Sequence, residues 1–168
     1  MSDVIRIGNC SGFYGDRLDA AREMVEGGPI DVLTGDYLAE LTMSILYNQQ
    51  QTRGEDTGYV GTFLKQVQDV AALCSEKNIK IVSNAGGLNP RSMALEVEKI
   101  LEALGLDLKV AYIDGDNLLP DLDQLQSDGE SFTNLDTQQH LKDSDQKALT
   151  ANAYLGGWGI KEALDQGA

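Results

Sequence analysis

The chain has 168 residues, enough for one well-buried core and short for two. Hydrophobic residues make up 42% and charged residues 24%, so we expect most of the chain to fold. The formal net charge of −14 disfavours nucleic acid as a partner. Much of this charge lies between residues 106 and 146, where ten acids face two lysines, as is typical of a solvated outer face.

The cysteines and the N-terminal residues suggest a compartment. Only Cys10 and Cys74 are present, and their separation suggests neither a disulfide framework nor a zinc site. No apolar stretch approaches the length that spans a bilayer, and the first residues lack the charged and apolar regions of a signal peptide. We therefore predict a cytoplasmic protein without a membrane partner.

Four apolar, β-branched runs each end in a polar or glycine-rich loop that leads into helical periodicity. The runs cover residues 4–8, 31–34, 79–83 and 109–113. Helical stripes follow at 17–26, 36–50, 59–77 and 90–104, and the second and third form a helical hairpin without a strand between them. Asn89 is the expected cap of the fourth helix, with Pro90 at its first position and Gly105 at its end.

The pattern weakens beyond residue 116. It predicts a short helix at 118–125, a polar excursion at 129–144, a fifth strand at 148–154 and a final helix at 160–165. These elements indicate an α/β fold with a mainly parallel sheet of about five strands and helices on both faces, an open Rossmann-like or flavodoxin-like sheet. The alternative is part of a larger α/β barrel-like domain. We expect one domain over residues 1–168, and its end on a helix suggests a piece of a longer domain.

Loops at the carboxyl ends of parallel strands gather into one crevice, where ligands bind. Asn9, Asp36, Asn84 and Asp114 each follow or end one of the four runs. We therefore expect these four side chains to surround a common hollow.

The first loop combines glycines with polar side chains between a strand and a helix. Asn9, Gly12 and Asp16 are candidate ligand contacts, because glycines allow close backbone approach and helix ends present free N–H groups to anions. The spacing matches neither a dinucleotide loop nor a Walker A loop, and Asp16 as a simple helix cap is the alternative. A nucleophilic role for Cys10 is disfavoured, because the only histidine, His140, lies in the polar excursion.

Asp36 and Glu40 lie one helical turn apart after the second run. Two close carboxylates can divide acid and base roles or share a divalent cation. Alternatively, they are an ordinary helix cap and first-turn acid.

The third loop offers an anion site through Asn84, Gly86, Gly87 and Arg91, with turn chemistry as the alternative. Asp114 and Asp116 follow the fourth run, but Leu119 and Leu125 occupy the glycine and glutamate positions of an EF-hand, which rules that motif out. Further along, Asn152 is a candidate site wall, and Trp158 is expected in the core.

Five blocks of the chain resemble, in order, the N-terminal domain of the acyclic terpene utilisation protein AtuA family. The blocks are Arg6-Ile-Gly-Asn9 with Gly12-Phe-Tyr-Gly-Asp16, Leu33-Thr-Gly-Asp-Tyr-Leu-Ala-Glu-Leu-Thr-Met43, Val82-Ser-Asn-Ala-Gly-Gly-Leu-Asn-Pro90, Asp114-Gly-Asp-Asn-Leu-Leu-Pro120 and Thr150-Ala-Asn-Ala-Tyr-Leu-Gly156. The resemblance implies a part in bacterial breakdown of branched acyclic terpenoids such as citronellol and geraniol, through coenzyme A thioesters. It carries over no residue-level mechanism. Cys10-Ser11 departs from the family pattern, and members usually continue with another glycine-containing strand and loop.

These observations favour an enzyme acting on an anionic acyl or acyl-CoA intermediate. Glycine-loop amides and Arg91 hold the anion in this hypothesis, while Asp36, with Glu40 or Asp114, performs acid–base or metal-assisted work. The residues identify no cofactor, although they leave room for a divalent metal. The expected partners are a small-molecule substrate and either a second copy or a further domain or subunit. A non-catalytic binding or assembly domain is the competing hypothesis, and an inactive structural fragment is the third.

Overall fold

The computed structural model describes residues 4–168, which divide into two compact units. Among the described residues, the first unit comprises 4–114 with Gly157–Ala168, and the second comprises Gly115–Gly156. The prediction of a single domain over the whole chain stays a prediction.

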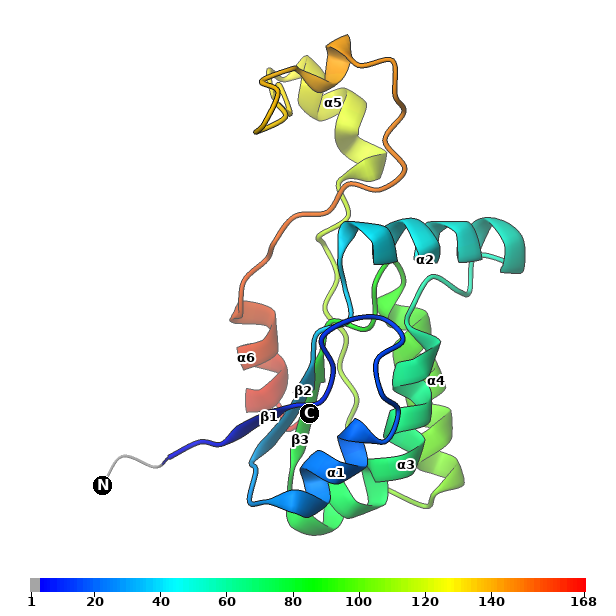
Figure 1. The fold of residues 1–168 in the computed structure, drawn as a ribbon, viewed down its shortest axis with the longest axis vertical. Coiled ribbons are helices and arrows are strands. Elements are labelled where there is room, and N and C mark those ends of the chain that lie inside the picture. The colour runs from blue at the N-terminus through cyan, green and yellow to red at the C-terminus, as the bar shows by residue number, and fades with distance from the viewer. Residues whose placement is uncertain (1–3) are drawn as a thin grey trace. The chain divides into compact units, whose positions relative to one another are not determined.

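The first unit contains a parallel three-stranded sheet of β1 (Ile7–Asn9), β2 (Val32–Gly35) and β3 (Lys80–Ser83), in the order β1-β2-β3 (Figure 1). The register aligns Gly8 with Leu33 and Leu33 with Ile81. The predicted open, parallel α/β class is therefore confirmed, but the described residues form three strands rather than five.

Consecutive strand order explains where the helices lie, since right-handed crossovers between neighbouring strands put their helices on one face. Helix α1 (Ala20–Gly27) packs on β1, β2 and α3 (Gly61–Lys77), which in turn packs on α4 (Pro90–Ala103). These three strands show no reversal of strand order, the feature that marks the switch point of a doubly wound sheet.

Three clusters of buried side chains hold the first unit together. The first lies between the sheet and helices α1 and α3, and the third joins α3 to α4. The second packs α2 (Glu40–Arg53) over the loops that follow β2 and β3. Their buried members are, in chain order, Cys10, Ala21, Val25, Leu33, Tyr37, Leu46, Val60, Val67, Val70, Ala71, Cys74, Ile79, Ala85, Val97 and Leu101.

The ends of α4 match the sequence prediction. The Asn89 side chain accepts a hydrogen bond of 3.0 Å from the Ser92 N–H, and Pro90 begins the helix. Gly105 ends it with a positive φ of 69°, and the Leu106 N–H bonds back to the Leu101 carbonyl. This is the glycine-terminated helix end that the sequence predicts.

The predicted fourth strand at residues 109–113 is wrong. This segment is irregular and packs instead on α6 (Trp158–Asp165): the Lys109 ammonium donates to the Gln166 carbonyl, and Ile113 lies against Gly159. Figure 1 draws α6 to the left of the strands and α3 and α4 to the right. Among the described residues, β3 therefore pairs only with β2.

The second unit contains short elements only: η1 (Leu119–Asp121), α5 (Leu122–Ser127) and η2 (Leu141–Asp143). The predicted fifth strand at 148–154 is also wrong, because its only pairing is an isolated bridge between Asn117 and Asn152. No helix in the described part of the chain is long and apolar enough to cross a membrane.

Candidate functional site

The two faces of the sheet differ in what covers them. Cys10 and Leu33 point into the cluster beneath α1 and α3. Because side chains alternate along a strand, Asn9, Thr34 and Val82, which the register aligns, point to the opposite face. Asp36 and Asn84 continue the same alternation just past β2 and β3.

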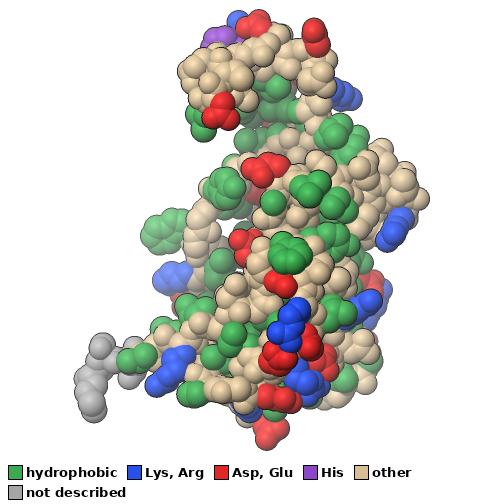
Figure 2. Space-filling view, in the orientation of Figure 1, with side chains coloured by type: hydrophobic (Ala, Val, Ile, Leu, Met, Phe, Trp, Pro, Cys, Tyr) green, Lys and Arg blue, Asp and Glu red, His purple; other side chains and the backbone are tan. Residues whose placement is uncertain are grey.

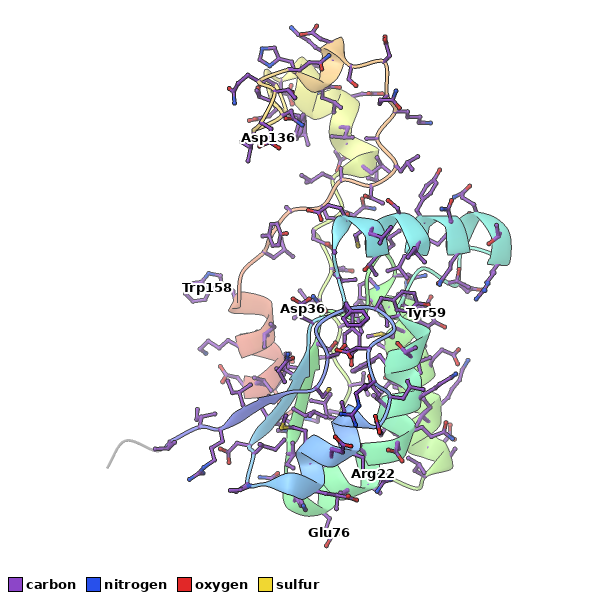
Figure 3. The ribbon with its side chains drawn as sticks, viewed as in Figure 1. Arg22, Asp36, Tyr59, Glu76, Asp136 and Trp158 are labelled. Carbon is purple, nitrogen blue, oxygen red and sulfur yellow. The ribbon has the colours of Figure 1, made fainter. Side chains whose placement is uncertain are left out.

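Asp36 and Asn84 join the loops after these two strands. The Asn84 side-chain amide donates a hydrogen bond of 2.7 Å to Asp36 Oδ1, and its carbonyl oxygen accepts the Tyr37 N–H at 2.9 Å. The Asp36 N–H reaches back to the Ser11 carbonyl at 2.9 Å, which ties the first loop to the second. Hydrogen bonds therefore link the loops that follow β1, β2 and β3 at one edge of the sheet. The common hollow expected around Asn9, Asp36, Asn84 and Asp114 stays a prediction. Figure 3 shows Asp36 near the upper ends of the strands.

The relation between Asp36 and Glu40 differs from the prediction. Helix α2 begins at Glu40 with Ala39 as its cap, so Asp36 precedes the helix. Asp36 Oδ1 accepts the Leu38 N–H at 3.3 Å, which makes an Asx-turn and holds its carboxylate toward Asn84. Glu40 is exposed in the first turn, where a carboxylate suits the helix dipole.

The first loop is closed by Asp16. One of its carboxylate oxygens accepts the Gly12 N–H at 2.9 Å, and the other accepts the Arg17 N–H at 2.8 Å. Both backbone hydrogen bonds lower the pKa of the Asp16 carboxyl, and the one from Gly12 has the larger effect. The Gly12 N–H is thus occupied within the protein. Asp16 organises the loop but does not cap α1, which begins at Ala20 after Asp19.

A buried polar chain beneath the site links three elements. The Tyr37 hydroxyl donates to the Gln66 side-chain oxygen at 2.5 Å, and the Gln66 amide donates to the Arg17 carbonyl at 3.3 Å. Burial raises the pKa of the Tyr37 hydroxyl and, more modestly, that of the neighbouring Cys10 thiol. Both groups stay protonated at neutral pH, so Cys10 is not an activated nucleophile.

Sequence reasoning missed Gln66 and Tyr37. A polar residue on the apolar stripe of α3, one turn from Phe63 and from Val70, was the available signal for Gln66. A cavity of about 10 Å³, lined by residues including Cys10, Leu33, Tyr37, Gln66 and Val70, lies beside these groups. That volume holds about one water molecule, so this cavity has no room for a substrate.

The third loop packs tightly against its surroundings. A Cβ at Gly86 would lie 2.7 Å from the Pro90 side chain, and one at Gly87 would lie 2.3 Å from Leu46. Gly87 also has a positive φ of 53°. At the N-terminus of α4, Asn89 already occupies the Ser92 N–H. Turn chemistry therefore accounts for both glycines, and the anion site predicted there stays a prediction.

The remaining predicted residues lie in other parts of the chain. Arg91 is exposed at the second position of α4, and Asp114 is exposed at the end of the first unit. In the second unit the Asn152 amide donates a hydrogen bond of 2.9 Å to Asp116. Across residues 4–168, no three histidine, cysteine or acidic side chains converge as a metal site.

Comparison with known families agrees with the five sequence blocks. The model of the acyclic terpene utilisation family protein AtuA matches residues 5–168. The chain belongs to this family. The AtuA match covers both compact units and every predicted site residue. Neither the curated proteins nor the solved structures contained a significant match.

Proposed function

We propose that the protein binds an acyl or acyl-CoA intermediate of acyclic terpenoid breakdown at the carboxyl ends of β2 and β3, and that Asp36 is its acid–base group. The hydrogen bond between Asp36 and Asn84 supports this most directly. It fixes one carboxylate oxygen, while Asp36 Oδ2 has no hydrogen-bond partner among residues 4–168 and the side chain is exposed.

Asn84 suits the role of a positioning residue because both of its polar atoms are engaged. Its amide nitrogen donates to the Asp36 carboxylate, and its oxygen accepts the Tyr37 N–H. These hydrogen bonds orient the Asn84 and Asp36 side chains. A carboxylate held in this way keeps the lone pairs of Oδ2 for a proton on a bound ligand. Proton transfer by a positioned carboxylate is common general-base chemistry.

The surface next to Asp36 suits a branched hydrocarbon chain. Thr34 and Val32 lie below it on the same face of β2, and Val82 lies beside Thr34 on β3. All three are half-buried, so they present methyl groups to a ligand without a deep pocket. A polar head at Asp36 and Asn84 would then continue into an apolar chain along the sheet.

A negative charge on the ligand needs a cation to offset the −14 of the chain. Arg17 is engaged by Asp19 at 3.0 Å and Glu23 at 2.5 Å. Arg91 contacts no acidic side chain within the described residues and is the candidate for this role. Glu40 and Asp114 remain candidate second carboxylates, and a divalent metal remains an optional addition.

The test uses coenzyme A thioesters of geranic and citronellic acid, with free coenzyme A and acetyl-CoA as controls. We expect the terpenoid thioesters to raise the melting temperature of the wild-type protein, because binding to the native state stabilises it. Asp36→Asn keeps an oxygen that can accept the Leu38 and Asn84 hydrogen bonds, so the variant should fold normally. Because it lacks the acid–base carboxylate, it should not convert the ligand.

A charge swap sharpens this test. Asn84→Asp alone puts a second carboxylate against Asp36 and should weaken folding. The double variant Asp36→Asn with Asn84→Asp restores one amide–carboxylate pair but moves the charge to position 84. A folded, inactive double variant supports Asp36 as the reacting group, whereas full activity in Asp36→Asn contradicts it.

The alternative is a non-catalytic assembly domain, and one observation favours it. Ile5, Ile7 and Trp158 are 69%, 66% and 81% exposed, which is high for residues of their size. Figure 3 shows Trp158 projecting away from α6. This function would be favoured if no thioester raised the melting temperature and the protein instead formed a stable complex with another subunit.

A further inference from the structure

The outer edge of β1 presents unpaired backbone groups. On its inner edge, the Arg6 carbonyl accepts the Val32 N–H at 3.2 Å and the Cys10 N–H donates to the Thr34 carbonyl at 2.8 Å. Because successive residues of a strand point their backbone groups to opposite sides, those of Ile7 and Asn9 point away from β2. Ile5 has the same parity, and no backbone partner for these three is present within residues 4–168.

Arg6 is the one charged side chain along this edge, and neither lysine nor proline occurs between Val4 and Asn9. Natural edge strands carry lysine, proline or a bulge, or are covered by another element. Here Val4, Ile5 and Ile7 are 69%, 69% and 66% exposed. Figure 1 shows this segment running out beyond the other two strands, and Figure 2 shows hydrophobic side chains at the surface there.

We infer that this edge pairs with the same edge of a second copy, antiparallel about a two-fold axis, and so extends the sheet across two chains. The register that uses all three outward residues puts Ile7 opposite Ile7 of the second copy and Ile5 opposite Asn9. Residues that face each other in this way exchange both of their hydrogen bonds, giving about six in total. The same register puts the two Ile7 side chains next to each other on one face.

The edge of β1 carries little charge, so a second copy can approach it despite the net charge of −14 of the chain. No acidic residue occurs between Val4 and Gly15, although the chain contains 27 in all. Arg6 is the only charged residue of this stretch, and its guanidinium lies 4.0 Å from the Asp31 carboxylate, which also accepts the Arg6 backbone N–H at 2.7 Å. In the proposed register Arg6 faces Gly8 of the second copy, so no like charges are opposed.

A two-strand contact of this length is small, so the dimer should dissociate at micromolar concentration. Sedimentation velocity across a concentration series measures it on the full chain. Ile7→Lys should weaken the dimer by about tenfold or more, since a lysine on an edge disfavours pairing. Ile7→Pro is the second variant, because it removes only an outward N–H. Leu41→Lys, at a 73% exposed residue of α2, is the matched control and should change nothing.

Cysteine trapping tests the register itself. Residues paired by hydrogen bonds across antiparallel strands have Cα atoms about 5.5 Å apart, within the range that a disulfide spans. Ile7→Cys should cross-link to itself under mild oxidation, and Leu41→Cys should not. A chain that stays monomeric throughout the series, or a dimer that folded Ile7→Lys and Ile7→Pro both leave intact, would overturn the inference.

Discussion

The two compact units are stabilised in different ways. The first unit contains three clusters of buried side chains around a parallel sheet. In the second unit, Gly115–Gly156, Leu122 is the one buried hydrophobic residue, and the unit also contains hydrogen bonds such as that between Asn152 and Asp116. Since burial of apolar surface is the main source of stability, we expect the first unit, which contains Asp36, to be the more stable of the two.

The largest effect that separates the units should come from Leu46→Ala. Leu46 is fully buried in the cluster beneath α2, so the variant leaves a cavity and should lower the free energy of unfolding by about 3 kcal/mol. Leu41→Ala on the exposed side of the same helix is the control, with an expected change near zero. Urea unfolding measures both, and equal effects would contradict the assignment of this core.

Gly87→Ala should cost about 2 kcal/mol, because a left-handed backbone and a close approach to Leu46 oppose a side chain. Gly129→Ala in the second unit also has a positive φ but meets open space, so it should cost about 1 kcal/mol. The same unfolding measurement compares them. Similar values would mean that packing around the third loop adds nothing to backbone strain.

The buried thiols make the stability of the first unit depend on pH. Burial raises the pKa of Cys74 to about 11, whereas an unfolded thiol has a pKa of about 8.5. The folded state therefore binds the thiol proton more tightly than the unfolded state does. The resulting stabilisation is fully present below about pH 8.5 and is lost as the pH rises toward 11. Cys74→Ala should flatten the alkaline part of the stability curve. An unchanged slope would show that the thiol is not buried in solution.

Leu122→Ala should give the smallest effect, about 1 kcal/mol, confined to the second unit. We expect faster amide exchange within Gly115–Gly156 and an unchanged melting temperature for the first unit. A parallel loss in both units would show that they unfold together and would remove the distinction between them.

The sequence was sufficient where local chemistry decides the structure. The runs that became β1, β2 and β3 are short and apolar, and Asn89 and Pro90 define the start of α4 by capping alone. The rule that parallel strands share one carboxyl edge put Asp36 and Asn84 in the same region, although their hydrogen bond itself was not predicted.

Other features depend on residues far apart in the chain. Residues 109–113 have a strand-like pattern, but contacts of Lys109 and Ile113 with α6, about 50 residues later, decide their conformation. Gln66 contacts Tyr37 and Arg17 only because three elements fold together. Periodicity does not encode such contacts, which is why Gln66 was missed and two strands were predicted in excess.

The central claim is that a ligand binds beside Asp36 and Asn84. Amide hydrogen exchange with and without the coenzyme A thioester of geranic acid tests it most directly, because the exchange rate is read at each backbone position. The account predicts slower exchange at Tyr37 and Leu38, whose N–H groups contact the Asn84 and Asp36 side chains. Bound thioester that leaves these two amides unchanged and protects only Gly115–Gly156 would contradict it.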